Sequence, residues 1–143
     1  MQKITLEQSS SVKLSIALHE SKNDLNLGVV QISHGMAEHM GRYSHFINHL
    51  NDEGFHVIIH NHRGHGDRLV DNKIGFFASS GGWQLIVDDL VSVHNWAVNQ
   101  YPELPHILMG HSMGSWAALS ALQGKTKFDL ALITSRVEIS IAL

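Results

Sequence analysis

The chain lacks several features that point to particular classes of protein. Its 143 residues include no cysteine, which excludes disulfide frameworks, thiol nucleophiles and thiolate metal sites. Its 10 Lys and Arg residues are outnumbered by 13 Asp and Glu, a balance that argues against a nucleic-acid-binding protein. No apolar run reaches the roughly 18 residues that a membrane-spanning helix needs.

The N-terminus also lacks the basic and apolar segments of a secretory signal. Together with the absence of cysteine, this makes a cytoplasmic location our expectation, with peripheral membrane contact left open. Hydrophobic residues make up 43% of the chain and charged residues 16%, so it can bury a core. We expect one domain over residues 1–143.

Histidine is unusually frequent, with 12 residues. Because an unperturbed imidazole titrates near pH 6.5, we expect stability to depend on pH between roughly pH 5 and 7. This composition alone does not identify a function.

Hydrophobic periodicity predicts strands that alternate with helices. This order favours an α/β fold with a mostly parallel sheet, in which the first strands form an antiparallel edge. Gly124 is expected to end the last helix. The predicted strands cover 11–19, 27–33, 55–60, 106–110 and 128–134, and the predicted helices cover 42–51, 83–99 and 115–123.

One motif carries recognisable chemistry. Gly110, His111, Ser112, Met113 and Gly114 match the pattern G-x-S-x-G between a predicted strand and a predicted helix. A sharp strand-to-helix turn exposes the serine hydroxyl, and the flanking glycines allow strand and helix to approach closely. The helix N-terminus adds positive potential where an oxyanion would form. Ser112 is therefore the candidate nucleophile, and the Met113 amide is a candidate oxyanion donor.

A second loop could complete an oxyanion site. His34, Gly35 and Met36 directly follow a predicted buried strand. Acyl transfer needs two N–H donors that converge on one oxygen, and we expect the Met36 amide to be the second. Glu38 is expected to hydrogen-bond the backbone of this loop and so to orient Met36.

Three motifs in this order resemble a known family. They are His34-Gly35-Met36-Ala37-Glu38-His39-x-Gly41-Arg42-Tyr43, His62-Arg63-Gly64-His65-Gly66 and Gly110-His111-Ser112-Met113-Gly114. Together they resemble the monoacylglycerol lipase and lysophospholipase-like branch of the α/β-hydrolases, of the serine aminopeptidase S33 type.

The resemblance implies a cofactor-independent serine hydrolase that cleaves carboxylic esters of lipid-like substrates through an acyl-enzyme. It implies that Ser112 is the nucleophile, that Met36 and Met113 supply the oxyanion amides, and that His111 flanks the nucleophile without being its base. Asn61 stands where the family commonly has aspartate, and we expect only a modest structural effect.

The sequence departs from the family after Ser112. In this fold the nucleophile is followed by an acid and then by a histidine, yet none of the 12 histidines lies beyond position 111. Asp129 falls too early to be the triad acid. We therefore expect an incomplete hydrolase domain without its lid and last strands, inactive or nearly so. Its unpaired sheet edge predicts self-association.

Two alternatives are open. One is a metal-binding protein, suggested by His60, His62 and His65 and by the helical pair His45 and His49. The other is a non-catalytic binding module on a hydrolase scaffold.

Other conspicuous side chains have ordinary structural interpretations. Asp88 and Asp89 are expected on a solvated helix face, with an ion pair. Trp96 and Trp116 are expected to pack in the core.

Overall fold

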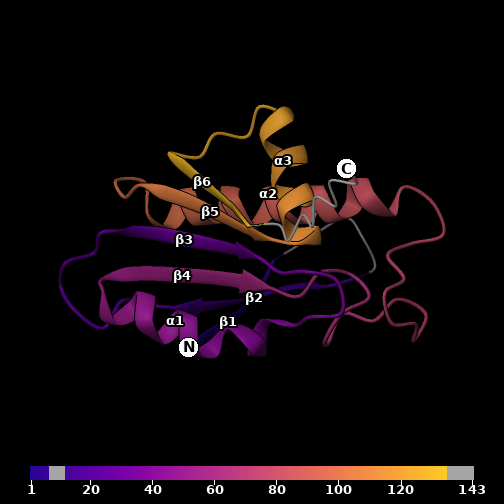
Figure 1. The fold of residues 1–143 in the computed structure, drawn as a ribbon, viewed down its shortest axis with the longest axis horizontal. Coiled ribbons are helices and arrows are strands. Elements are labelled where there is room, and N and C mark those ends of the chain that lie inside the picture. Colours follow the sequence, from indigo (N-terminus) through magenta and orange to yellow (C-terminus); the bar gives the residue numbers. More distant parts are fainter. Residues whose placement is uncertain (7–11, 135–143) are drawn as a thin grey trace, which may run out of the picture.

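The computed structural model, which describes residues 1–6 and 12–134, is built around one twisted sheet of six strands (Figure 1). Their spatial order is β1-β2-β4-β3-β5-β6. Strands β1 and β2, and β2 and β4, pair antiparallel, whereas β4, β3, β5 and β6 run parallel. The strands are β1 (Gln2–Leu6), β2 (Leu14–His19), β3 (Gly28–Ser33), β4 (Phe55–His60), β5 (His106–His111) and β6 (Leu130–Thr134). This confirms the α/β class with an antiparallel N-terminal edge.

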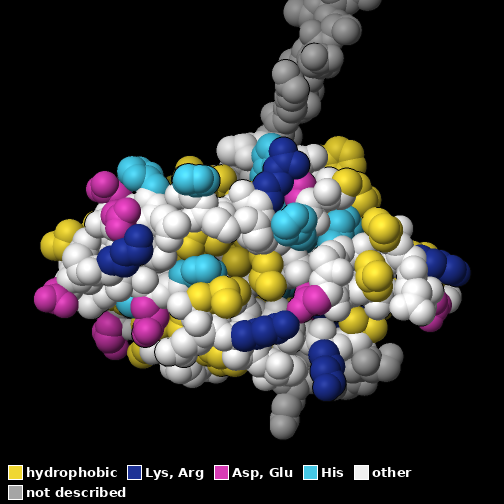
Figure 2. Space-filling model, turned by 90° about the horizontal axis from the view of Figure 1, so that it is seen from below, with side chains coloured by type: hydrophobic (Ala, Val, Ile, Leu, Met, Phe, Trp, Pro, Cys, Tyr) yellow, Lys and Arg dark blue, Asp and Glu magenta, His cyan; other side chains and the backbone are white. Residues whose placement is uncertain are grey.

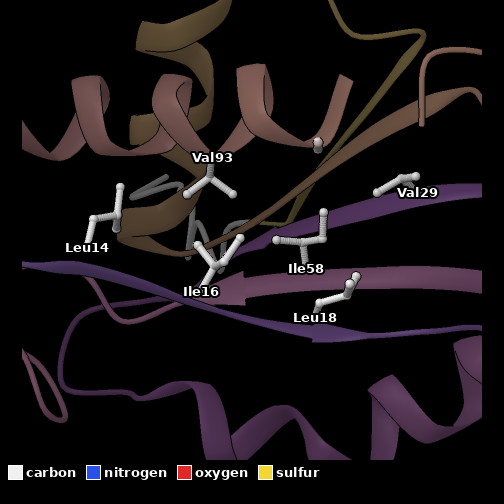
Figure 3. Close-up of a cluster of buried hydrophobic side chains, with 7 residues drawn as sticks. Leu14, Ile16, Leu18, Val29, Ile58 and Val93 are labelled. Atoms are coloured by element: carbon white, nitrogen blue, oxygen red, sulfur yellow. The ribbon is translucent and has the colours of Figure 1, made fainter. Parts of the chain in front are cut away.

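Helices cover both faces of the sheet. In Figure 1, η1 (Met40–Tyr43) and α1 (Ser44–Asp52) lie on one side, and α2 (Gly82–Gln100) and α3 (Met113–Gln123) lie on the other. Successive strand residues point to opposite faces, so Ile59 packs with Ile47 of α1, whereas Ile58 packs with Val93 of α2 (Figure 3). This explains why the central strands read as continuous apolar runs.

The α3 region differs from the sequence-based expectation. The helix begins at Met113 rather than Ser115, because Ser112 already takes the N-cap position. Gly124 is the C-cap and ends the helix as expected, but its φ of −72° is right-handed, and the left-handed position falls on Lys125 with φ +71°. Trp116 is 66% exposed, so its assignment to the core was wrong. The helix packs on the sheet through Ala117, Ala118 and Ala121 instead.

Strand β6 forms the edge of the sheet among the described residues and carries exposed apolar side chains. Leu130 is 50% exposed and Leu132 is 48% exposed. Because an apolar edge strand can pair with another chain, we predict that the protein self-associates as its concentration rises. Light scattering after size-exclusion chromatography should give a mass above 15.9 kDa.

Leu132→Lys should shift this equilibrium toward the monomer by placing a charge on the edge. Leu25→Lys, at a position that is 64% exposed outside the strands, is the matched control and should not shift it. A monomeric mass for the unaltered chain at all concentrations would count against association through β6.

Candidate active site

The turn between β5 and α3 holds Ser112 in an unusual backbone conformation. Its φ is +53° and its ψ is −122°, outside the regions that non-glycine residues ordinarily occupy. Such a conformation costs about 1–3 kcal/mol and persists only where the surroundings enforce it. Ser112 N–H donates to Thr134 O at 2.9 Å, which ties the turn to β6.

Two glycines permit this turn. A Cβ atom added at Gly110 would lie 2.7 Å from Ser115 Cα, and one at Gly114 would overlap the carbonyl oxygen of Ser33. The N-terminus of α3 therefore rests directly on the end of β3, as the G-x-S-x-G pattern requires. The first N–H groups of α3, including that of Met113, lie beside Ser112.

The loop after β3 lies against Ser112. A Cβ atom added at Gly35 would be 3.1 Å from Ser112 Cβ, so a larger residue would crowd the serine. The next amide, that of Met36, makes no hydrogen bond among the described residues. Ser112 Oγ likewise has no hydrogen-bond partner there. The structure thus brings together the serine and both loops that the sequence singled out.

Glu38 folds back onto this loop. Its Oε2 accepts hydrogen bonds from Gly35 N–H at 2.8 Å and from the Tyr43 hydroxyl at 2.7 Å. Burial raises the pKa of the Glu38 carboxyl, but these hydrogen bonds, with Arg42 and His111 nearby, hold it below its usual value. Tyr43 stands in the motif Gly41-Arg42-Tyr43, yet sequence reasoning gave it no role. Its contact with Glu38 becomes visible only when η1 folds over the loop.

No histidine nitrogen hydrogen-bonds to Ser112 Oγ among the described residues. His111, the neighbour of Ser112, directs Nδ1 to Thr134 Oγ1 at 3.2 Å, and its Nε2 lies 3.8 Å from Glu38 Oε1. Asp129 accepts from His106 N–H at 2.7 Å, at the opposite end of β5 from Ser112. Neither residue supplies a general base to the serine.

The loop after β4 carries a buried ion-pair network. The Asp89 carboxylate lies 2.9 Å from Arg63 Nε and 2.9 Å from Arg68 Nη1. The Asp89 side chain is only 1% exposed, so the expected ion pair is present but the solvated helix face was wrong for this residue. Its neighbour Asp88 is exposed. The network anchors the loop to α2.

Asn61 joins three segments at this loop. Its Oδ1 accepts from Met40 N–H at 2.8 Å, and its Nδ2 donates to Asp67 Oδ1 at 2.8 Å. Asp67 also accepts from Lys3 Nζ at 2.8 Å. An amide is suited to this position because it can accept on one side and donate to a carboxylate on the other.

Asn61→Asp is therefore expected to lower the free energy of unfolding by about 1–2 kcal/mol at pH 7. The substitution removes the amide donor and places a second carboxylate against that of Asp67. Urea unfolding measures the loss. The double variant with Asp67→Asn should recover part of it, since the amide and carboxylate then exchange places. Equal stability of Asn61→Asp and the unaltered chain would contradict this interpretation.

The histidines do not form a metal centre among the described residues. No group of three or more His, Asp or Glu side chains there is arranged to hold a metal ion. The His60 and His62 rings lie 5.0 Å apart between centroids in an edge-to-face arrangement, and His62 Nε2 lies 3.1 Å from Ser33 Oγ.

A cavity of about 320 Å³ lies away from the serine, between β2, β4 and the η1–α1 segment. Ile47, Ile59 and Met40 contribute apolar walls, and His19 and His39 contribute polar ones. Figure 2 shows this side of the molecule, with hydrophobic side chains exposed in the middle and histidine side chains among them. Neither Ser112 nor Gly35 lines the cavity, so it is separate from the candidate active site.

The sheet order, the strained serine and the adjoining glycine loops define an α/β hydrolase. Consistent with this, the family model described as "Serine aminopeptidase, S33" matches residues 26–140, and the chain belongs to that family. No helix within residues 1–6 and 12–134 combines the length and hydropathy required to cross a bilayer.

Curated relatives carry lipase names. A monoacylglycerol lipase of Mycolicibacterium smegmatis is 39% identical over 87 residues, which is 61% of this chain and 29% of that protein. A monoglyceride lipase of Rattus norvegicus is 32% identical over 108 residues, which is 75% of this chain and 34% of the rat protein. The chain thus spans about a third of the length of these relatives.

Solved structures agree. A thermostable carboxyl esterase from Bacillus coagulans, in complex with glycerol, superposes with a TM-score of 0.80 at 29% identity, covering 92% of this chain and 43% of the esterase. A monoglyceride lipase variant from Saccharomyces cerevisiae shares the fold, with a TM-score of 0.72 at 23% identity over 87% of this chain and 40% of the lipase.

Proposed function

We propose that Ser112 is the nucleophile of a carboxylic-ester hydrolase for monoacylglycerol-like lipids. The observation that carries the proposal is the conformation of Ser112, a non-glycine residue with φ +53° between β5 and α3, with Gly35 packed against its Cβ. In this conformation Ser112 is exposed, and its hydroxyl has no hydrogen-bond partner among the described residues. The lipase names of the relatives support a monoacylglycerol over a lysophospholipid as the substrate.

The proposed chemistry begins with attack of Ser112 Oγ on the ester carbonyl. The carbonyl oxygen becomes an oxyanion, which the Met36 and Met113 amides stabilise. Collapse of the tetrahedral intermediate expels the alcohol and leaves an acyl group on Ser112, and water then releases the acid. His34, Gly35, Glu38, Gly110, His111 and Gly114 shape or support the two loops.

The step that lacks a partner among the described residues is removal of the proton from the Ser112 hydroxyl. A serine hydroxyl without a base is a poor nucleophile at pH 7, and no histidine hydrogen-bonds to Ser112 among the described residues. We infer that the 143-residue chain alone turns over esters close to the buffer rate. An added soluble base should then accelerate acylation.

The test compares the unaltered chain with Ser112→Ala, using p-nitrophenyl butyrate and imidazole. We expect butyryl transfer to the chain, seen as a gain in intact mass mapped to Ser112, to grow with imidazole concentration and to be absent in Ser112→Ala. The Ser92 hydroxyl donates to Asp88 O within α2, so Ser92→Ala is the matched control and should acylate normally.

If Ser112→Ala gained as much mass as the unaltered chain, or if no variant gained mass, Ser112 would not be the nucleophile. In that case the non-catalytic binding module becomes the better interpretation. Rapid turnover without imidazole that Ser112→Ala abolishes would retain the nucleophile but overturn the inferred inactivity.

A further inference from the structure

Two histidines link the loop after β3 to the loop after β4 by reciprocal hydrogen bonds. His62 N–H of the second loop donates to His34 Nε2 of the first at 2.9 Å. Ala37 N–H of the first loop donates to His65 Nε2 of the second at 3.1 Å. The His34 and His65 rings lie 5.4 Å apart between centroids in an edge-to-face arrangement. We call these four residues the histidine clasp.

The second ring nitrogens define the protonation state of the clasp. His34 Nδ1 lies 2.8 Å from Gly35 O, and His65 Nδ1 lies 2.9 Å from Arg63 O. Because a carbonyl oxygen only accepts, each Nδ1 carries the proton and each Nε2 is free to accept the backbone N–H. A doubly protonated imidazole has no acceptor, so the clasp requires both rings to be neutral.

The clasp constrains the peptide units around Met36. Gly35 N–H is held by Glu38 at 2.8 Å and Glu38 N–H by Gly35 O at 3.3 Å, while the clasp holds Ala37 N–H. Ala37 has a φ of +60°, a left-handed conformation that is unfavourable for a residue with a Cβ atom. In the part of the chain that the structure describes, Met36 N–H thus has no hydrogen-bond partner, although the amides on either side of it are bonded.

We propose that His34 and His65 are positioning residues that hold the Met36 amide in place as an oxyanion donor. This rests on the proposed function of Ser112 and Met36. The histidines do not touch the reacting atoms; they act through Ala37 and His62 by fixing the conformation of the first loop.

Burial favours the neutral form of His34 and of its neighbours His60 and His62. Burial lowers the pKa of His34 to about 4, with His65 and His39 opposing its protonation and Glu38 favouring it. The His62 ring lies 4.5 Å from the His34 ring between centroids. Burial lowers the pKa values of His62 and of His60 on β4, which keeps both rings neutral. The His65 ring faces Phe77 at 6.1 Å between centroids.

NMR of the full chain tests the clasp without any need for activity. Long-range ¹H–¹⁵N spectra at pH 7 should show His34 and His65 with a protonated Nδ1 and an unprotonated Nε2. Either ring with its proton on Nε2 would overturn the proposal, because that nitrogen could not accept the amide.

Hydrogen exchange separates positioning from mere packing. His65→Leu removes the acceptor and should speed exchange of the Ala37 amide about tenfold. His65→Gln offers a carbonyl oxygen as replacement acceptor and should keep that amide protected. His49→Leu, an exposed histidine on α1, is the control and should change nothing. Unchanged Ala37 exchange in His65→Leu would refute the clasp.

Imidazole-dependent acylation of Ser112 provides the functional arm. His65→Leu should slow the acylation step by about 10²-fold with little change in substrate affinity, whereas His65→Gln should restore it. Normal acylation in His65→Leu would refute the positioning role even if the clasp exists. If Ser112 is never acylated in the unaltered chain, the proposed function fails, and with it the positioning role, while the NMR result still decides whether the clasp exists.

Discussion

Replacing Asp89 with asparagine is expected to lower the free energy of unfolding by about 3–5 kcal/mol, the cost typical of breaking a buried ion pair by removing one partner. Asp89 accepts from Arg63 Nε at 2.9 Å and Nη2 at 3.1 Å, and from Arg68 Nη1 at 2.9 Å. The Arg63 and Arg68 side chains are only 4% and 2% exposed. A neutral amide would remove the carboxylate that lies between two buried guanidinium groups.

The adjacent aspartate provides a matched control. Asp88 is exposed and bonds to Gln84 Nε2 at 2.8 Å within α2, so Asp88→Asn should change stability by less than about 0.5 kcal/mol. Urea unfolding of both variants at pH 7 gives the comparison. If Asp89→Asn stays within about 1 kcal/mol of Asp88→Asn, the network does not contribute as described.

Asp89→Asn should also loosen the candidate active site. Arg63 belongs to the loop that carries His62 and His65, and its carbonyl fixes the His65 ring at 2.9 Å. The destabilisation therefore reaches the loop that contacts Ala37. The ion-pair network joins α2 to the loop after β4. Through the hydrogen bond from Ala37 to His65, this loop in turn supports the loop after β3, which lies beside Ser112.

The contrast between Asp88 and Asp89 shows that the sequence predicts a helix but not the tertiary partners of its side chains. Periodicity placed α2 within a residue of its observed ends, because its apolar stripe is a local pattern. The same pattern does not say which of two neighbouring aspartates meets arginines that lie 26 and 21 residues earlier. That pairing depends on the path of the loop from 61 to 81, which has no period to read.

Trp116 illustrates the same limit on a helix. Aromatic residues favour the interior on average, and this favoured a core position for it. In α3, however, the close approach to β3 and β5 admits only small side chains, and alanines occupy that face. The glycine pattern around Ser112 was the signal for this close approach, since Gly114 lies directly on Ser33.

The motifs were more informative than composition. G-x-S-x-G located the strained serine to the residue, because only glycine fits at Gly110 and Gly114. The loop after β3 lies beside it, with Gly35 close to Ser112 Cβ. The histidine count, in contrast, predicted a titration near pH 5–7 by treating the 12 imidazoles as free. Burial changes that expectation.

Acid is expected to destabilise the protein mainly below pH 6.5. Burial lowers the pKa of His34 to about 4 and that of His60 to about 3, the latter beside Arg68. Between these values and pH 6.5 the unfolded chain binds protons that the folded chain does not, so stability falls as pH falls. Each such histidine contributes about 1.4 kcal/mol per pH unit, which amounts to about 3 kcal/mol from His34 alone by pH 4.

His60→Leu separates this effect from general acid sensitivity. Within residues 1–6 and 12–134, neither ring nitrogen of His60 has a hydrogen-bond partner, although the side chain is fully buried. Replacing an unpaired buried polar ring with an apolar side chain should leave stability at pH 7 unchanged or raise it by about 1 kcal/mol. Urea unfolding between pH 7 and 4.5 should then show a slope reduced by about 1.4 kcal/mol per pH unit.

The exposed His49 is the control for this slope. His49→Leu removes an imidazole from the surface of α1 and should leave the pH dependence of the unfolding free energy as it is. A large loss of stability in His60→Leu at pH 7 would mean that the His60 nitrogens are satisfied in solution.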